Sequence, residues 1–161
     1  MTRVRPAEER DIRVLYLAWQ ELRQHNAKQD SRIRPTPVSE VDFAIAVREL
    51  RDRPRSLTLV AEEEGNFAGF LTASIETNQP DRLPERHATI GYLYVLPAYR
   101  RRGLATELVR YAFDWARQQE GISHVEMSVL EHDAAARAFW ESLGFSPFIR
   151  RVWASLEPAA S

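Results

Sequence analysis

The chain has 161 residues, of which 44% are hydrophobic, and this length and apolar content suit one domain with a single core. Its 22 Lys and Arg against 23 Asp and Glu residues give a net charge of −1, which argues against a broad electrostatic grip on nucleic acid or on an acidic membrane. Cysteine is absent, so disulfides, cysteine-ligated metals and thiol nucleophiles are excluded.

A short strand and two helices are predicted at the start of the chain, with the strand beginning at Thr2. An amphipathic helix follows, because apolar residues recur there at helical spacing, namely at Ile12, Leu15, Trp19 and Leu22. After a proline-containing loop, Ser39 and Asp42 resemble a capping box and open a second helix that extends to about Asp52.

Strands dominate the middle of the chain. Alternating apolar residues from Ser56 to Gly65, and again from Phe67, predict a β-hairpin. A β-rich stretch from His87 to Val95 follows a loop and is stopped by a proline.

The second half alternates between helix and strand. Helices are predicted at 104–120 and 133–143, and strands from His124 and from Phe148. The resulting order, βααβββαβαβ, is that of a mixed α/β fold that combines an antiparallel meander with a strand–helix–strand–helix unit. We expect one domain over residues 1–157 and a frayed tail over 158–161.

The turn in 95-VLPAYRRRGLA-105 is the most informative stretch, because Arg100–Arg102 run into Gly103 between a strand and a helix. The first N–H groups of a helix have no internal partner, and the helix dipole adds about half a positive charge there. Such a turn suits a pyrophosphate, although it matches neither the P-loop nor the dinucleotide-binding fingerprint. The alternatives are a solvated turn and a nucleic-acid-binding patch. The net charge of −1 argues against the second of these.

Two motifs carry a family resemblance. Val95–Ala105 resembles motif A of the GNAT superfamily of acyl-coenzyme A N-acyltransferases, whose core [RQ]-x-x-G-x-[GA] is met by Arg100, Gly103 and Ala105. Ala136–Phe145 resembles the family's C-terminal motif, a helix followed by a Gly-Phe turn. The resemblance implies a single-domain GNAT-like fold, in which helices flank a mixed central sheet whose middle strands splay apart.

The resemblance also implies an activity. The family transfers the acetyl group of acetyl-CoA to a primary amine by direct attack in a ternary complex, and the acceptor is a small molecule such as an aminoglycoside or polyamine, or a protein amine. Backbone amides at 101–106 would hold the pyrophosphate, and the strand at 93–95 would pair with the pantetheine arm. The residues implied to bind the coenzyme are Leu93, Tyr94, Val95, Arg100, Arg101, Arg102, Gly103, Leu104, Ala105, Thr106, Asp133, Ala136 and Trp140.

The sequence departs from the common pattern of the family at the positions of the general acid and the general base. Many relatives have a tyrosine at the position of Trp140, whose indole N–H donates hydrogen bonds but does not supply a proton. If the strand alternates, its inward face consists of His87, Thr89, Gly91, Leu93 and Val95, none of which is a carboxylate.

The remaining catalytic candidates are His87, Tyr94 and Ser128, with Glu126 as a further one. For His87 the favoured interpretation is an exposed histidine at a strand end. The oxyanion donor is expected to be the N–H of Val95 or of a neighbour. Asp133, where relatives often have asparagine, is a good helix cap. A coenzyme A-binding regulatory module that turns over weakly is the alternative function.

The partners follow from charge and spacing. Asp30, Glu40 and Asp42 lie in the region where relatives bind the acceptor, and their charge suits an ammonium group. The histidines show no metal spacing, so no metal is expected. We expect no nucleic-acid or membrane partner and, because the first residues lack the apolar run of a signal peptide, a cytoplasmic protein. A homodimer is possible, with Arg150-Arg151 at its edge.

Overall fold

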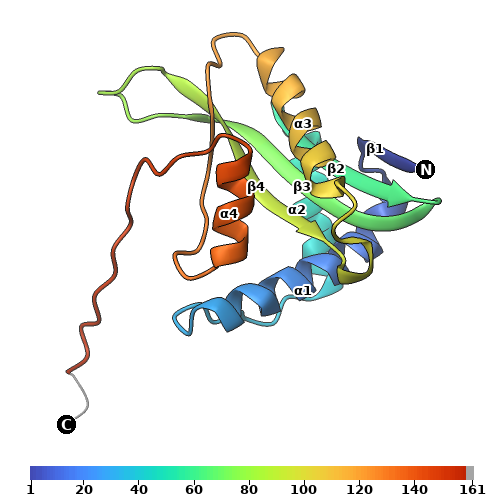
Figure 1. Ribbon diagram of the computed structural model, residues 1–161, viewed down its shortest axis with the longest axis horizontal. Coiled ribbons are helices and arrows are strands. Elements are labelled where there is room, and N and C mark those ends of the chain that lie inside the picture. Colours follow the sequence, from blue (N-terminus) through green and yellow to red (C-terminus); the bar gives the residue numbers. More distant parts are fainter. Residues whose placement is uncertain (159–161) are drawn as a thin grey trace.

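The structure, a computed structural model, describes residues 1–158 and is built on one five-stranded sheet in the order β1-β2-β3-β4-β5 (Figure 1). The strands are β1 (Thr2–Pro6), β2 (Ser56–Glu63), β3 (Asn66–Thr77), β4 (Arg86–Val95) and β5 (Val125–Met127). Neighbours from β1 to β4 pair antiparallel, whereas β5 runs parallel to β4. The mixed α/β fold expected from the sequence is therefore confirmed.

Helices cover both faces of this sheet (Figure 1). They are α1 (Ile12–Gln29), α2 (Glu40–Asp52), α3 (Leu104–Arg117) and α4 (Ala134–Ser142), with short 3₁₀ turns η1 (Glu9–Asp11) and η2 (Pro97–Tyr99). The Ser39 cap expected for the second helix is present, since the Asp42 N–H donates to the Ser39 hydroxyl oxygen at 3.1 Å.

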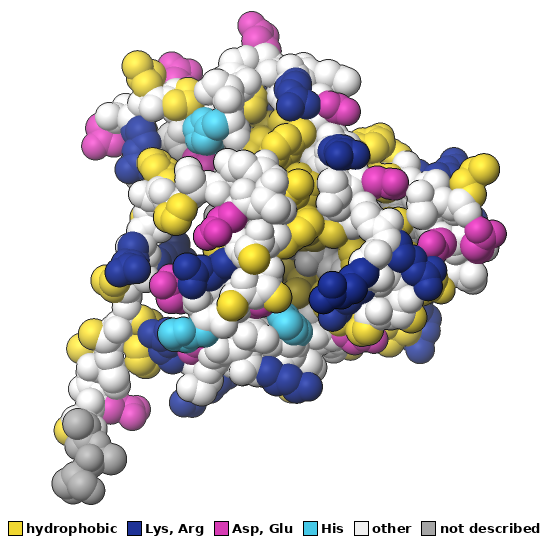
Figure 2. All heavy atoms as spheres, in the orientation of Figure 1, with side chains coloured by type: hydrophobic (Ala, Val, Ile, Leu, Met, Phe, Trp, Pro, Cys, Tyr) yellow, Lys and Arg dark blue, Asp and Glu magenta, His cyan; other side chains and the backbone are white. Residues whose placement is uncertain are grey.

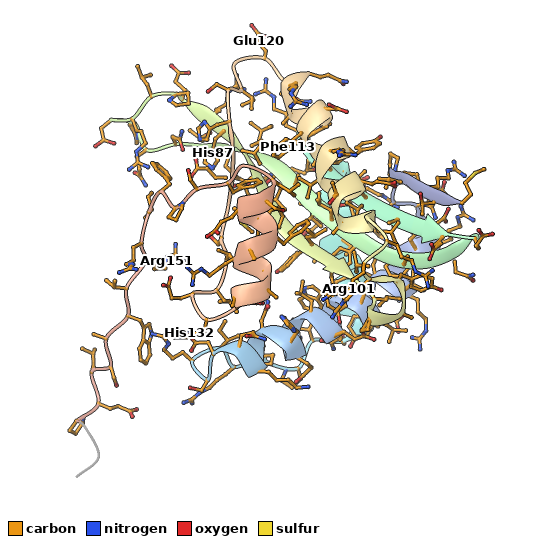
Figure 3. The ribbon with its side chains drawn as sticks, in the orientation of Figure 1. His87, Arg101, Phe113, Glu120, His132 and Arg151 are labelled. Atoms are coloured by element: carbon orange, nitrogen blue, oxygen red, sulfur yellow. The ribbon has the colours of Figure 1, made fainter. Side chains whose placement is uncertain are left out.

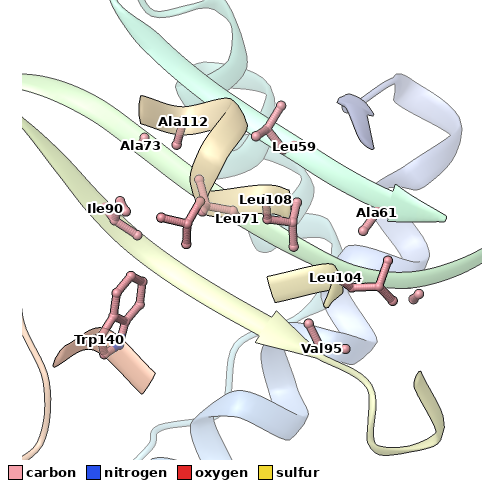
Figure 4. Close-up of a cluster of buried hydrophobic side chains, with 12 residues drawn as sticks. Leu59, Ala61, Leu71, Ala73, Ile90, Val95, Leu104, Leu108, Ala112 and Trp140 are labelled. Carbon is pink, nitrogen blue, oxygen red and sulfur yellow. The ribbon is translucent and has the colours of Figure 1, made fainter. Parts of the chain in front are cut away.

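Two apolar layers hold the helices to the sheet. On one face, Leu104 and Leu108 of α3 and Trp140 of α4 pack in a cluster with Leu71 and Ile90 (Figure 4). On the other face, a second cluster joins α1 and α2 to the sheet and consists of Ala7, Ile12, Leu15, Ala18, Leu22, Phe43, Ala44, Val60, Phe70 and Tyr94. Each side chain can therefore be assigned to one face of the sheet by the cluster to which it belongs.

A β-bulge in β4 interrupts the alternation of side chains. Thr72 of β3 pairs with Tyr92, but the next residue, Ala73, pairs with Ile90, so Gly91 is the extra residue. The N–H of Tyr92 donates to the Thr72 side-chain oxygen at 3.0 Å, and a Cβ on Gly91 would lie 2.9 Å from that same oxygen. Position 91 therefore requires glycine, because the Thr72 side-chain oxygen approaches it too closely for a Cβ.

The bulge changes which residues share a face, and strict alternation over 87–95 is wrong for this reason. Ile90 and Leu93, three residues apart, both belong to the α3–α4 side. His87 and Thr89 therefore lie on the same face as Tyr92 and Tyr94, and not on that of Leu93 and Val95. Strict alternation would have placed Tyr92 and Tyr94 on the opposite face from His87.

The paired region between β4 and β5 is short. Only three residue pairs join the strands, from Ala88 with Val125 to Ile90 with Met127, although β4 continues to Val95. The expected fifth strand, which was predicted to start at His124, is therefore only three residues long. Beyond Ile90 the two strands diverge, which agrees with the splayed middle strands implied by the family resemblance.

The final strand predicted from Phe148 is wrong for the single chain. Residues 146–158 are exposed and have no regular secondary structure, and they lead away from the body of the molecule (Figure 1). A strand requires a neighbouring backbone to hydrogen-bond to, and this segment does not lie along the sheet. Of the frayed tail expected at 158–161, all but Pro158 lies outside the described residues.

Thr72 offers a test of the bulge. Thr72→Val preserves the shape of the side chain but leaves the Tyr92 N–H without its acceptor, so we expect the free energy of unfolding to fall by about 1–3 kcal/mol. Thr72→Ser keeps the oxygen and is expected to lose clearly less. Urea denaturation of both variants measures the difference, and equal losses would show that the hydrogen bond does not stabilise the bulge.

Candidate active site

The divergence of β4 from β5 leaves one side of β4 without a strand partner. The Leu96 N–H donates to the Ala68 carbonyl at 2.8 Å, which marks this as a hydrogen-bonded pair of the β3–β4 ladder. Such pairs alternate in an antiparallel ladder, so the pairs of Leu93 and Val95 are of the other type. Their N–H and C=O groups consequently point away from β3, into the gap between β4 and β5.

A cavity of about 270 Å³ lies where the two strands separate. It is lined by the bulge and by the end of β5, namely by Thr89, Ile90, Gly91, Glu126, Met127 and Ser128. Ser128, a catalytic candidate from the sequence, is therefore next to the bulge, and Glu126 is the carboxylate of this cavity.

The start of α3 forms the other end of the site. Gly103 caps the helix with φ of 80°, a left-handed conformation that only glycine adopts without strain, and the first helical hydrogen bond runs from the Glu107 N–H to the Gly103 carbonyl at 3.0 Å. The N–H groups of Leu104, Ala105 and Thr106 precede that bond and so have no partner within the helix. They form a helix terminus with free donors, at the position where the sequence predicts that an anion binds.

The three arginines of the turn have different surroundings. Arg100 folds back, because its Nε donates to the Val95 carbonyl at 2.9 Å. Arg102 forms an ion pair with Glu63 on β2. Arg101, which is exposed and has a φ of 61°, lies on the turn itself (Figure 3). Figure 2 shows basic side chains gathered at this turn, beside hydrophobic side chains that follow the space between α3 and α4.

Helix α4 contributes a cap and a buried aromatic ring. Asp133 caps the helix as expected, accepting from the Ala136 N–H at 3.1 Å, and its second oxygen lies 2.9 Å from His25 Nε2 on α1. Trp140 is 6% exposed and packs edge-on against Phe145, with ring centres 5.1 Å apart. Its ring is oriented towards β4 (Figure 4), on the α3 side of the gap.

Two histidines flank Glu126. Glu126 Oε2 lies 2.9 Å from His124 Nε2 and 3.3 Å from His87 Nδ1, and the two imidazole rings are stacked with centres 5.7 Å apart. The His87 side chain is only 13% exposed, so the exposed strand-end histidine considered from the sequence is not what the structure contains. This group, His87, His124 and Glu126, is called the histidine–glutamate cluster below.

Sequence reasoning did not connect His124 with this cluster. It considered His124 only as a metal ligand, whereas the spacing of two residues between His124 and Glu126 on a strand places both side chains on one face. That signal was available in the sequence. The contact with His87 was not, because it depends on the register between β4 and β5.

Tyr94 is placed differently from its neighbours in β4. Its side chain belongs to the α1 layer, and its hydroxyl donates to Glu21 Oε2 at 3.1 Å. Burial and the bond to Glu21 raise the pKa of Tyr94 above its ordinary value. The structure therefore brings Leu93 and Val95 into the gap but turns the side chain of Tyr94 away from it.

The acidic residues expected to attract an amine are mostly paired with arginines. Asp30 accepts hydrogen bonds from the Arg32 side chain and backbone, which hold the pKa of Asp30 far below its usual range, and Glu40 forms an ion pair with Arg13. Their charge is locally neutralised. The carboxylate that faces the cavity is instead Glu126.

Residues 1–158 contain neither a membrane-spanning helix nor a metal-binding group. No helix in this range combines the length and the apolar character required of a membrane span. Among the same residues, no three side chains of the types that hold metals are grouped as a metal site.

The chain belongs to the acetyltransferase (GNAT) family, whose model matches residues 19–145. It is 31% identical over 123 residues to an aminoglycoside N(6′)-acetyltransferase type 1 from Acinetobacter haemolyticus, a match that covers 73% of this chain and 81% of the relative. It is also 32% identical over 111 residues to the acetyl transferase GW6a of Oryza sativa subsp. japonica, covering 63% of this chain but only 26% of that much longer relative.

Solved structures agree with this assignment. The crystal structure of an aminoglycoside antibiotic 6′-N-acetyltransferase from Acinetobacter haemolyticus superposes with a TM-score of 0.73 at 25% identity, covering 97% of this chain and 99% of the other. A predicted acetyltransferase from Clostridium acetobutylicum, solved with acetyl-CoA, gives a TM-score of 0.73 at 18% identity, with 97% of each chain covered. The latter supports the fold alone.

Proposed function

We propose that this acetyltransferase moves the acetyl group of acetyl-CoA to a primary amine within a ternary complex. The observation that carries the proposal is the open side of β4, where Leu93 and Val95 direct backbone polar groups into a gap that leads from the α3 terminus to the cavity at Gly91. Relatives support the choice of acceptor class, since one neighbour at 16% identity was solved with a bisubstrate analogue named CoA-S-monomethyl-acetylneamine.

Two features of the gap support its assignment to coenzyme A. The N–H groups of Leu104–Thr106 face the position of a pyrophosphate, and no atom lies within 4 Å of a Cβ placed on Gly103. The pantetheine arm, which carries amides, would hydrogen-bond to Leu93 and Val95 as an added strand does. Acetyl-CoA supplies an activated acyl group at the inner end of this gap.

Transfer needs an oxyanion donor and a proton acceptor. The amine nitrogen attacks the thioester carbonyl carbon, the C–N bond forms while the C–S bond breaks, and the amine proton must leave because the free amine has a pKa near ~10. We assign the oxyanion contact to the Leu93 N–H, which is closer to the cavity than that of Val95. The leaving thiolate is protonated through solvent, because Trp140 cannot supply the proton.

The proton route is assigned to the histidine–glutamate cluster. Glu126 faces the cavity and attracts an ammonium group by its charge, and His87 accepts the proton through Glu126 or a water. Ser128 lines the same cavity and would orient that water or the acceptor. Tyr94 is the least supported of the three catalytic candidates, because its hydroxyl donates a hydrogen bond to Glu21.

The activity is tested by thiol release from acetyl-CoA against a panel containing an aminoglycoside, a polyamine and a peptide with a free N-terminus. The chain contains no cysteine, so the protein itself adds no thiol signal. We expect turnover with at least one amine and none with its acetylated form. Coenzyme binding without turnover on any amine would favour the regulatory module, and no binding by calorimetry would refute the proposal.

Gly103 tests the coenzyme site. Gly103→Glu places a carboxylate where the pyrophosphate is proposed to bind, so we expect the affinity for acetyl-CoA to fall at least ~100-fold in calorimetry. Gly65→Glu is the matched control, since Gly65 has a φ of 79° and is equally free of atoms within 4 Å, but lies in the β2–β3 turn. Both variants should lose similar thermal stability. Retained affinity in Gly103→Glu would place the coenzyme elsewhere.

His87→Ala tests the proton route through the pH dependence of kcat. The variant should lose about 10²-fold in kcat, the lower end of general-base contributions, and its pH profile of kcat should differ from that of the parent. His132→Ala, at an exposed position on the loop before α4 (Figure 3), is the control and should behave like the parent. An unaltered profile for His87→Ala would remove His87 from the mechanism.

A further inference from the structure

A second cavity, of about 200 Å³, adjoins the proposed acceptor cavity. It lies where the loop between β3 and β4 meets the start of β5, and it is called the loop cavity below. Glu126 lines both cavities, and its side chain lies beside His87 and His124. An acceptor whose nitrogen lies next to Glu126 in the first cavity can therefore extend past this carboxylate into the loop cavity.

Three apolar side chains contribute to the lining of the loop cavity, namely Leu83, Pro84 and Phe148. Leu83 is 85% exposed and Phe148 is 67% exposed, so an apolar group bound between them would remove hydrophobic surface from water. Concave sites with apolar walls and a few polar groups are typical of small-molecule binding. The apolar lining therefore predicts that the part of the acceptor beyond the amine is hydrophobic.

The size of the loop cavity limits the acceptor further. An apolar protein cavity of about 150 Å³ is large enough to bind one benzene molecule. The loop cavity, at about 200 Å³, accommodates a group of that size with a short linker. The several linked rings of an aminoglycoside exceed this volume.

The charges around the two cavities favour an acceptor with a single positive charge. Glu126 is the one carboxylate within the two linings, and Arg82 contributes a positive charge to the loop cavity. A second ammonium group in the loop cavity would lose hydration against Leu83 and would be repelled by Arg82, without a carboxylate of its own. A polycationic amine is therefore disfavoured there.

We propose that the acceptor is a primary monoamine with one compact apolar group, such as an aromatic ring, on a short linker. Its nitrogen would lie beside Glu126 in the first cavity, and its apolar group would occupy the loop cavity. This inference rests on the proposed function, whose transfer step is unchanged: the amine nitrogen gains the acetyl group, its proton passes to the histidine–glutamate cluster, and coenzyme A leaves as the thiol. It differs from the aminoglycoside class that one structural neighbour was solved with.

A comparison of amines tests the proposed acceptor class. Thiol release from acetyl-CoA is measured with 2-phenylethylamine, ethylamine, 1,4-diaminobutane and an aminoglycoside. We expect kcat/KM for 2-phenylethylamine to exceed that for ethylamine by about 10-fold or more, because burial of an apolar group of this size contributes a factor of that order. It should also exceed the values for the two polycations.

Leu83→Asp tests the place of the apolar group. The measured quantity is the ratio of kcat/KM for 2-phenylethylamine to kcat/KM for ethylamine, in which a general loss of activity cancels. We expect this ratio to fall about 10-fold in Leu83→Asp, whereas Leu83→Met retains an apolar side chain and should keep most of it. Val41→Asp is the matched control, because Val41 is 69% exposed in the first turn of α2 and lines neither cavity, so the ratio should not change.

The outcomes separate this inference from the proposed function. An unchanged ratio in Leu83→Asp, or faster turnover of the polycations than of 2-phenylethylamine, would overturn the inference and leave the acetyltransferase activity in place. Turnover of none of the amines, with coenzyme binding retained, would instead refute the proposed function and the inference with it.

Discussion

The separation of β5 from β4 after three residue pairs is the constraint on which the site depends. It leaves the N–H and C=O groups of Leu93 and the N–H of Val95 without a neighbouring strand, whereas the Val95 carbonyl accepts from Arg100 Nε. Backbone polar groups without a partner are costly where water is excluded. Helices α3 and α4 cover the gap from one face, with Trp140 in the same core cluster as Ile90 (Figure 4). The fold thus contains a slot in the sheet whose polar groups an extended, amide-containing ligand can satisfy.

The β-bulge at Gly91 determines the chemistry on either side of this slot. By adding one residue to β4, it turns Leu93 towards α3 and leaves His87 and Thr89 on the opposite face, beside Glu126 of β5. Leu93 and His87 are consequently on the same strand but on different faces. In the proposed function, this arrangement separates the binding of the acyl donor from the removal of the amine proton.

The short strand β5, which borders the slot, also forms the outer edge of the sheet. A three-residue β5 is a weak strand, and within the described chain nothing pairs with its second side. The segment after α4 carries exposed apolar side chains, among them Phe148, Val152 and Trp153, and it does not lie along this edge.

The sequence by itself determined the helices, the first four strands and the turn before α3. Helical spacing, the Ser39 cap and the Arg100–Gly103 motif depend on residues close together in the chain, so local rules were sufficient for them. Only the tertiary structure decided the bulge at Gly91, the contact of His87 with Glu126 and the fate of the segment from Phe148. Each of these depends on pairing between distant segments, and in the last case the segment folds as a strand only where another backbone is available to hydrogen-bond with it.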